Sequence, residues 1–295
     1  MKTFIISAIT LFRSLYLIIG YHSLKHIDKN RIDVSKYITL VDEVSENKVQ
    51  VNWKYVVSII AVENKNKIKN ISDDKIKNTA NLFIEKSDNG YKLNSLDNVL
   101  NKLNFTDKEK ERVNDYIDQL KYFGLTPYRL KEDSKYTKFI EEIKDEAIKN
   151  YKEYKILPSI TIAQAILESS WGESDLAQIY NNLFGIKADS SWKGEYVTLE
   201  TFEFYDTKIE DKFRVYSNKN QSIKDHAKFL VDNQRYKKYG VFEAKTYIEQ
   251  AYALQNAGYS TAEDNSGQKR YAKDLIELIR QYNLQLIDSE IKISD

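Results

Sequence analysis

The chain has 295 residues, which is enough for one large domain or two modest ones, each with its own core. Apolar residues make up 42% of the sequence and charged residues 30%, a balance typical of a folded chain. The 45 Lys and Arg residues against 44 Asp and Glu leave a net charge of +1, so no global field indicates nucleic acid as a partner. The sequence has no cysteine, which excludes disulfides, thiol nucleophiles and thiolate metal sites.

The histidines do not indicate a metal site. His22 and His26 have the four-residue spacing of one helix face, but no third ligand accompanies them. His226 lies far along the chain, and we expect it to be a hydrogen-bonded structural residue. We therefore expect neither a metal ion nor another cofactor.

An apolar run from Phe4 to Tyr21 is broken by a single charge, Arg13. A central Arg costs roughly 2.5–3.5 kcal/mol on the insertion scale, and the ten Leu, Ile and Phe side chains of the run offset it by about 3–6 kcal/mol. No small-residue cleavage site follows the run. We expect residues 1–21 to be an uncleaved signal-anchor that crosses the cell membrane once, with the rest of the chain extracytoplasmic.

The charges that flank this run favour the opposite orientation. Lys2 precedes it, whereas Lys25, Lys29 and Arg31 follow it, and positive residues are retained preferentially on the cytoplasmic side. The alternative interpretation is an amphipathic or buried N-terminal helix.

Residues 22–50 are polar and charged, and we expect them to form a stalk. From Val51 to about Phe123, apolar residues recur every three or four positions, which predicts helices. Thr106 and Glu109 have the spacing of a capping box at a helix start. We therefore expect residues 51–125 to form a small helical domain, whose role the sequence does not indicate.

Two glutamates end apolar helices. Glu63 does so in the helical domain, which raises the possibility of a second active site; a solvated helix end is the favoured interpretation, because no aromatic–glycine motif follows. Glu168 ends the apolar stretch from Ser159 to Leu167, which predicts a buried helix, and Trp171 follows. Desolvation there raises the pKa of a carboxyl group, as a general acid requires, although a structural glutamate bonded to hydroxyls fits equally well.

An ordered series of motifs around Glu168 resembles the glucosaminidase domain of glycoside hydrolase family 73. The resemblance covers roughly residues 135–285, through segments 157–174, 181–187, 192–194, 201–204, 213–217, 222–230 and 257–261. It implies a mainly α chain with a lysozyme-like catalytic domain, made of a helical lobe and a small β-bearing lobe. The small helical domain and the membrane anchor precede this catalytic domain, and residues 286–295 follow it as a C-terminal tail.

The resemblance also implies roles for individual residues. Glu168 matches the family's catalytic acid, and Glu203 matches a second acidic residue in a Thr-x-Glu-aromatic segment. The polar–apolar alternation of residues 197–205 independently predicts a strand there, so that Glu203 and Glu200 point to opposite faces. Tyr259 matches a tyrosine close to the catalytic acid. The sequence departs from the family pattern at residues 262–270, before Tyr271.

Four further residues are candidates for substrate binding. Trp171 and Trp192 fit either sugar-stacking platforms or core positions. Asn182 and Phe184, next to Asn181, are expected to shape the turn below the cleft, where Gly185 permits a tight backbone.

The resemblance implies a peptidoglycan hydrolase on the cell-wall side of the membrane, an endo-β-N-acetylglucosaminidase acting on the bond between N-acetylglucosamine and N-acetylmuramic acid. Its partners are then peptidoglycan glycan strands and, through the anchor, the membrane. A muramidase or a lytic transglycosylase on the same fold is the alternative enzyme. A non-catalytic wall-binding scaffold is the alternative outside enzymes.

Overall fold

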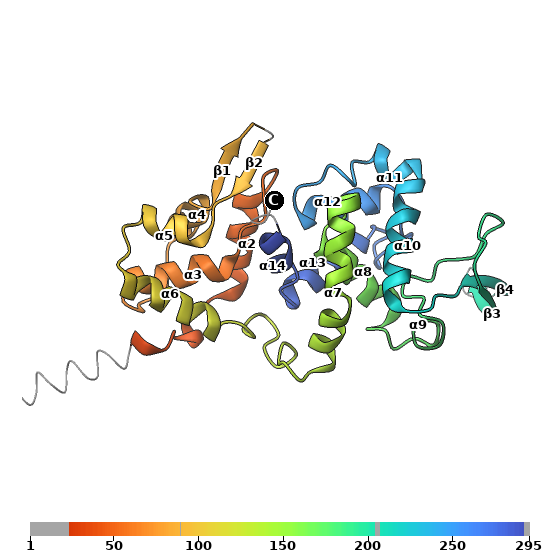
Figure 1. Cartoon of the computed structure of the whole chain (residues 1–295), viewed down its shortest axis with the longest axis horizontal. Coiled ribbons are helices and arrows are strands. Elements are labelled where there is room, and N and C mark those ends of the chain that lie inside the picture. The colour runs from red at the N-terminus through yellow and green to blue at the C-terminus, as the bar shows by residue number, and fades with distance from the viewer. Residues whose placement is uncertain (1–23, 89, 204–206, 292–295) are drawn as a thin grey trace, which may run out of the picture. The chain divides into compact units, whose positions relative to one another are not determined.

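The computed structural model describes residues 24–88, 90–203 and 207–291 (Figure 1). They form two compact units: unit 1 covers the chain up to Ser45 together with Val51–Phe123, and unit 2 covers Glu46–Gln50 together with the chain from Gly124 onward. The expected signal-anchor, residues 1–21, lies outside the described residues. Within the described ranges, no helix combines the length and the apolar character needed to cross a membrane.

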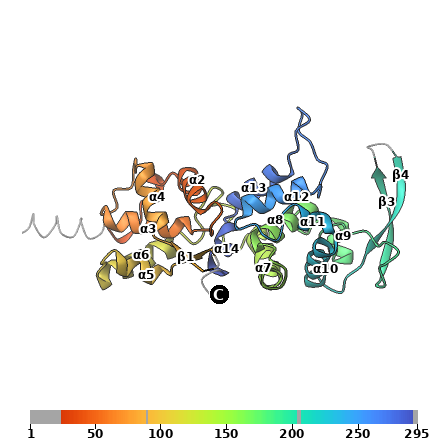
Figure 2. The ribbon, with the colours of Figure 1, turned by 90° about the horizontal axis from the view of Figure 1, so that it is seen from above.

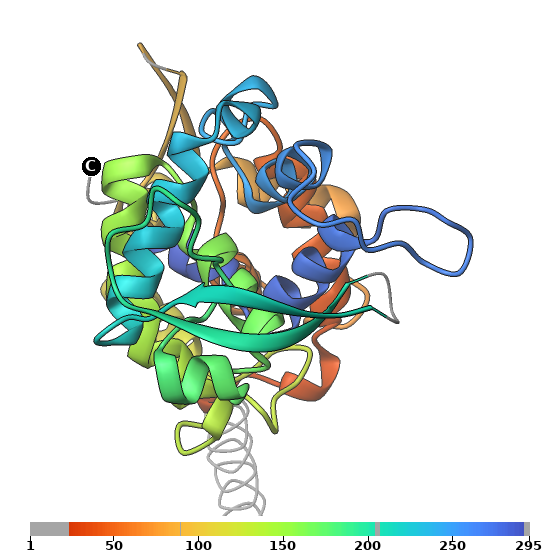
Figure 3. The ribbon, with the colours of Figure 1, turned by 90° about the vertical axis from the view of Figure 1, so that its right-hand side faces the viewer.

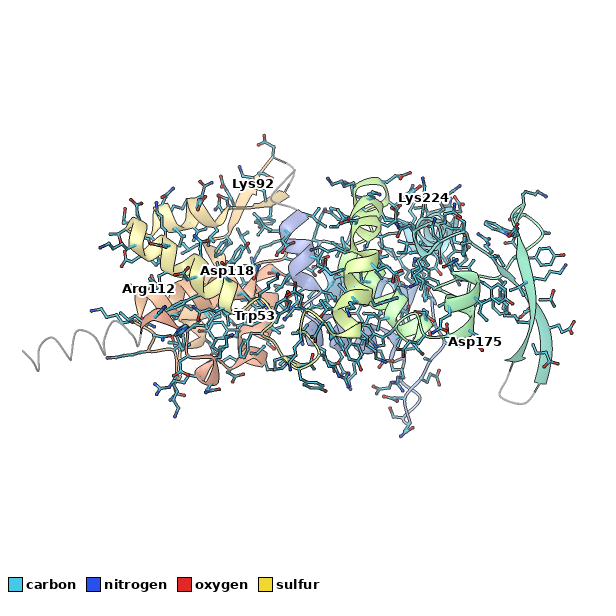
Figure 4. All side chains as sticks on the ribbon, turned by 60° about the horizontal axis from the view of Figure 1, so that its bottom comes forward. Trp53, Lys92, Arg112, Asp118, Asp175 and Lys224 are labelled. Carbon is cyan, nitrogen blue, oxygen red and sulfur yellow. The ribbon has the colours of Figure 1, made fainter. Side chains whose placement is uncertain are left out.

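Unit 1 is helical around a buried centre. Its elements are η1 (Lys29–Arg31), α2 (Val34–Ser45), α3 (Trp53–Glu63), α4 (Asp73–Asn81), β1 (Ile84–Ser87), β2 (Gly90–Leu93), α5 (Leu96–Lys102) and α6 (Asp107–Gln119). Helix α3 contacts α2, α4 and α6. Trp53, at the start of α3, lies among the side chains of unit 1 and exposes 1% of its surface (Figure 4).

The segment expected to be a stalk contributes to this core instead. Helix α2 lies within residues 22–50 and buries Tyr37, Ile38, Val41 and Val44, which follow each other at one-helix-face spacing between charged residues. The preceding backbone is also held, because the Gln119 side chain accepts a hydrogen bond from the Ile27 backbone N–H at 3.1 Å. Its apolar residues, spaced three and four apart, indicate a helix, but the charged residues between them make the segment resemble a polar linker.

Side-chain contacts in unit 1 account for two features of the sequence, the capping box and Glu63. The predicted capping box is confirmed, since the backbone N–H and the hydroxyl of Thr106 both donate to Glu109, at 2.9 and 2.8 Å. Glu63 forms an ion pair with Lys75 at 2.7 Å, which accounts for it as a helix-end residue. The antiparallel hairpin of β1 and β2 was not expected from the sequence.

Unit 2 is also mainly helical, as predicted. Its elements are α7 (Lys135–Tyr154), α8 (Pro158–Ser169), α9 (Asp175–Tyr180), β3 (Tyr196–Glu203), β4 (Thr207–Arg214), α10 (Lys219–Asp232), α11 (Gln234–Lys238), α12 (Tyr247–Asn256), α13 (Tyr271–Gln281) and α14 (Gln285–Ile291).

Helix α8 is the centre of unit 2. It contacts α7, α12, α13 and α14, and every residue from Pro158 to Ile166 is buried. Pro158 opens it at the first helical position, where a missing N–H costs nothing. The predicted buried helix is confirmed, and its first solvent-exposed residues are Leu167 and Glu168 at the C-terminal end.

The N-terminus of α8 is capped from elsewhere in the chain, because Leu157 at the cap position has no polar side chain. The buried carboxylate of Asp288, on α14, accepts hydrogen bonds from the backbone N–H of Ser159 at 3.0 Å and from its hydroxyl at 2.5 Å. The side chain of Gln250 accepts from the backbone N–H of Leu157 at 2.7 Å. Residues 286–291 of the segment expected to be a tail, 286–295, therefore belong to a helix that packs on α8, and residues 292–295 lie outside the described residues.

Strands β3 and β4 form an antiparallel hairpin, paired from Tyr196 with Arg214 to Glu203 with Thr207. Strand β3 confirms the predicted strand over residues 197–203, whereas residues 204 and 205 lie outside the described residues. The base of the hairpin is tied to the preceding loop, where the Arg214 backbone N–H donates to the Ile186 carbonyl at 3.0 Å and that of Ala188 donates to the Lys212 carbonyl at 2.7 Å. The hairpin stands beside α9 and α10 and lies across the helices of unit 2 (Figures 2 and 3).

Replacement of Asp288, the α14 residue that caps α8, tests how much this cap contributes to stability. Asp288→Ala leaves two buried donors of Ser159 without an acceptor, so we expect the free energy of unfolding to fall by roughly 2–3 kcal/mol in denaturant titrations. Glu290→Ala is the matched control on the same helix. Glu290 is exposed and lies 3.8 Å from Lys144, so its loss should change stability by less than about 0.5 kcal/mol. Equal effects of the two substitutions on the free energy of unfolding would show that Asp288 does not stabilise the start of α8.

Candidate active site

The chain leaves α8 through three consecutive residues in the left-handed region. Ser170, Trp171 and Gly172 have φ values of 51°, 66° and 72°. A side chain at Gly172 would be strained by this φ, and its Cβ would also lie 2.7 Å from the ring of Phe139. The hydroxyl of Ser169 fixes the turn by accepting from the Gly172 backbone N–H at 2.7 Å. The turn holds the last residues of α8, and Glu168 with them, in one geometry.

Trp171 is held by other aromatic rings. Its ring packs edge-on against Tyr136, Phe139 and Tyr282, with centroid distances of 4.7, 6.1 and 4.5 Å. This packing supports an unusual left-handed backbone at a bulky residue. Of the two interpretations of Trp171, the structure places it in an aromatic cluster.

Glu168 contacts a tyrosine that lies 103 residues away in the sequence. The hydroxyl of Tyr271, at the start of α13, donates a hydrogen bond to Oε1 of Glu168 at 3.1 Å. Nε2 of Gln164, one helical turn before Glu168, donates in turn to the Tyr271 hydroxyl at 2.9 Å. The three side chains therefore form a hydrogen-bonded line, Gln164–Tyr271–Glu168, from the buried part of α8 to its exposed end.

The surroundings of Glu168 raise the pKa of its carboxyl group. Its side chain reaches solvent, but protein atoms crowd the carboxyl group, and this desolvation raises its pKa above the ordinary value for glutamate. The hydrogen bond from Tyr271 acts in the opposite direction, because it stabilises the carboxylate. Desolvation is the larger effect, so the protonated form persists to higher pH than in an ordinary glutamate. A solvent-accessible carboxylic acid of this kind can donate a proton to a bound substrate.

Tyr259 lies behind Tyr271. The two rings stack with centroids 5.2 Å apart and planes inclined by 20°. The Tyr259 hydroxyl lies 3.1 Å from Nε2 of His226. Burial, and then the charge of Glu168, raise its pKa well above the ordinary value, so Tyr259 stays protonated. The structure thus brings Tyr259 close to the acid but places Tyr271 in direct contact with it.

His226, on α10, is a structural residue in this arrangement. Its ring stacks on Phe184 at 3.9 Å with an interplanar angle of 8°. Burial lowers the pKa of His226 to about 3, so the ring is neutral at working pH. A histidine that stays neutral fixes the Tyr259 hydroxyl without adding charge near Glu168.

Asn182 and Phe184 lie in the turn after α9. Asn182 is buried, and its Nδ2 donates to the carbonyls of Ile186 and Arg214 at 3.0 and 2.9 Å, while its Oδ1 accepts from the Ile186 backbone N–H at 3.1 Å. These bonds join the turn to the base of the β3–β4 hairpin. Gly185 in the same turn has a φ of 61°.

Trp192 lies in the loop before β3 and is partly exposed. Its Nε1 donates to the Glu195 carbonyl at 2.9 Å, and the guanidinium of Arg214 lies 4.5 Å from its ring centroid. The cation covers part of the ring system, and the indole is fixed in position.

Glu203 is the last residue of β3 and pairs with Thr207. The hairpin and the loop between α12 and α13 project from the same side of unit 2 (Figures 2 and 3). The strand carrying Glu203 and the loop preceding Tyr271 therefore extend in a common direction.

The structure identifies two residues that the sequence did not single out, Gln164 and Tyr271. Gln164 could have been found from its four-residue spacing to Glu168 on one helix face. Tyr271 was obscured by the departure from the family pattern at residues 262–270. In the described part of the chain, no three His, Asp or Glu side chains gather as they would around a metal ion.

The sequence of this chain is similar to those of several known proteins. Residues 144–284 match the glucosaminidase family, described as mannosyl-glycoprotein endo-beta-N-acetylglucosaminidase. The exo-glucosaminidase LytG of Bacillus subtilis is 44% identical over 156 residues, which cover 51% of this chain and 52% of LytG. The peptidoglycan hydrolase FlgJ of Salmonella typhimurium is 37% identical over 129 residues, or 41% of this chain and 38% of FlgJ. The chain thus spans about half of LytG and less of FlgJ.

Among solved structures, the catalytic domain of the autolysin Auto from Listeria monocytogenes is similar to this chain. It is 33% identical with a TM-score of 0.46, and the match covers 62% of this chain and 98% of that domain. Glu168, Glu203, Tyr259 and Tyr271 all lie within the range that matches the family.

The raised pKa of Glu168 has a consequence for stability. A carboxyl group whose pKa is raised by folding favours the folded state when protonated, and that contribution is lost as the pH rises through the folded-state pKa. Glu168→Gln, which cannot ionise, should therefore raise Tm at pH 7 by about 1–3 °C and leave it unchanged at low pH, where wild-type Glu168 is protonated. Thermal unfolding at pH 4 and pH 7 checks this. A difference between variant and wild type that does not grow with pH would contradict the shift.

Proposed function

Because residues 144–284 form a glucosaminidase domain, we propose that this protein is a peptidoglycan hydrolase, an endo-β-N-acetylglucosaminidase that cleaves the β-1,4 bond between N-acetylglucosamine and N-acetylmuramic acid. One observation carries the proposal: Glu168 leaves the buried helix α8 with a raised pKa and a hydrogen bond from Tyr271. Relatives that are named peptidoglycan hydrolase and exo-glucosaminidase support the choice of substrate.

In the proposed reaction, protonated Glu168 donates its proton to the glycosidic oxygen as the bond to the anomeric carbon breaks. The carboxylate that forms accepts the hydrogen bond from Tyr271. Water adds to the anomeric carbon and gives its proton to Glu203 if that residue activates the water, or to the Glu168 carboxylate if Glu203 only stabilises the oxocarbenium-like state. We assign to Glu203 either the activation of this water or the stabilisation of the oxocarbenium-like state.

The other expected site residues support this centre in different ways. We assign Asn182 and Phe184 to shaping the turn, Trp171 to holding the end of α8, and Tyr259 to packing behind Tyr271. Trp192, which is partly exposed and fixed, is our candidate for contact with the sugar. We further propose a lysozyme-like arrangement, in which the helices of unit 2 form one lobe and the β3–β4 hairpin the other.

A muramidase is the second candidate. A probable N-acetylmuramidase of Lactococcus lactis is 35% identical over 154 residues, and such an enzyme cuts the alternate bond of the same strand. A lytic transglycosylase, which needs no second carboxylate, and a non-catalytic wall-binding scaffold are the remaining alternatives.

Digestion of purified peptidoglycan distinguishes these functions. Mass spectrometry of borohydride-reduced products should find reduced N-acetylglucosamine at the new ends, on fragments of several sugars as an endo-acting enzyme gives. Reduced muramic ends would indicate a muramidase, anhydro-muramic ends a transglycosylase, and release of terminal units alone an exo-acting enzyme. Glu168→Gln should lower kcat about 100-fold or more. Undiminished hydrolysis by that variant would remove Glu168 from the mechanism.

We propose that the protein acts on the cell-wall side of the membrane and is tethered there by residues 1–21. The apolar run from Phe4 to Tyr21 and the location of the proposed substrate support this assignment. The full-length chain should then remain with membranes after an alkaline carbonate wash and be released by detergent. Recovery of the intact chain from the soluble cytosol would exclude the tether.

A further inference from the structure

The hydrogen-bonded line that ends at Glu168 begins at a side chain that cannot reach the substrate. Gln164 lies on α8 with no exposed surface. Its Nε2 donates to the hydroxyl oxygen of Tyr271 at 2.9 Å, and that hydroxyl lies 3.1 Å from Oε1 of Glu168. Gln164 and Glu168 are four residues apart, so one helix face presents both to the same tyrosine.

The direction of these bonds is fixed by the first donor. A tyrosine hydroxyl has one proton and can either donate or accept along a given line. Because Nε2 of Gln164 is a donor, it occupies the acceptor side of the Tyr271 oxygen and leaves the proton for Glu168. Without this donor, the hydroxyl can also turn toward the neighbouring Tyr259, and its hydrogen bond to the carboxylate weakens.

One of the two polar atoms of the buried Gln164 amide is unsatisfied within the described part of the chain. Its Oε1 is buried without a hydrogen-bond partner among the described residues. A buried polar atom in this state costs stability, and an apolar side chain of similar size would avoid that cost.

We propose that Gln164 is a positioning residue, which orients the Tyr271 hydroxyl so that its proton stabilises the Glu168 carboxylate formed when the acid has protonated the leaving group. The inference rests on the proposed function of Glu168. It adds a residue that acts only through Tyr271 and never touches the substrate.

Other charged and titratable groups also lie around α8, but among the side-chain contacts of the described residues Gln164 is connected to Glu168 only through Tyr271. Tyr271 of α13 and Tyr259, which follows α12, lie near enough to be affected by the charge of Glu168, and a hydrogen bond with Tyr271 also acts on the pKa of Tyr259. On α14, Asp288 contacts the opposite end of α8, and on α7, Lys135 pairs with Glu173. Gln164 therefore reaches the carboxylate through Tyr271.

The test is the titration of Glu168 in the full-length protein with 13C-labelled glutamate side chains, in which loss of a signal in Glu168→Gln assigns the resonance. Gln164→Met should raise the pKa of Glu168 by about half a unit, the size expected for weakening one hydrogen bond. Tyr271→Phe should raise it at least as much. In the Tyr271→Phe background, Gln164→Met should add no further shift, since the two residues act in series.

Thr161→Val is the matched control. Thr161 also lies on α8, is buried, and has a hydroxyl without a partner among the described residues, but no interaction connects it to Glu168. This variant should leave the pKa of Glu168 unchanged. The Tm of Gln164→Met should equal or exceed that of the wild type, because the unsatisfied Oε1 is removed.

Kinetics supply a second readout. Gln164→Met should lower kcat by up to about threefold, the equivalent of half a pKa unit, and leave KM unchanged. The basic limb of the pH profile should move to higher pH by the same half unit.

Two results would overturn the proposal: a Gln164→Met shift no larger than that of Thr161→Val, or an equal shift when Tyr271 is already Phe. Failure of the proposed function is a separate outcome. It would appear as full activity of Glu168→Gln, whereas the titration of Glu168 does not depend on activity.

Discussion

Burial of helix α8 on every side is the constraint on which unit 2 depends. A helix that is apolar around its whole circumference needs neighbours on all faces, and α7, α12, α13 and α14 supply them. The unpaired backbone N–H and C=O groups at its ends must then form hydrogen bonds with groups from other segments. Solvent is reached at the C-terminal end, and the carboxyl group placed there is crowded by protein while still accessible. The position of Glu168 and its altered acidity are consequences of the same packing.

A layer of aromatic rings connects this helix end to the rest of unit 2. Phe184 and His226 form one stacked pair, Tyr259 and Tyr271 another, and the contact between His226 and Tyr259 joins them. Each polar group in the layer is neutral, because burial keeps the histidine deprotonated and the tyrosines protonated. The layer therefore orients hydrogen bonds near the carboxyl group without adding a charge that would compete with it.

Local patterns in the sequence were sufficient for features that depend on neighbours along the chain. The buried helix that leads to Glu168, the strand through residues 197–203 and the capping box at Thr106 follow from apolar composition, alternation and side-chain chemistry. Features that depend on distant contacts were not predictable in this way. The Tyr271 contact spans 103 residues. The sequence predicts a tail where α14 lies, because the apolar face of α14 is defined by the residues that it covers. It predicts a stalk where helix α2 lies, because charged residues between the apolar positions mask their periodicity.

The cap on α8 has a consequence for the order in which the domain is completed. The backbone N–H of Ser159 is satisfied by a carboxylate 129 residues later in the chain. The first turn of α8 therefore gains this acceptor only when α14 docks on it. Until then, the helix that presents Glu168 is incompletely capped at its other end.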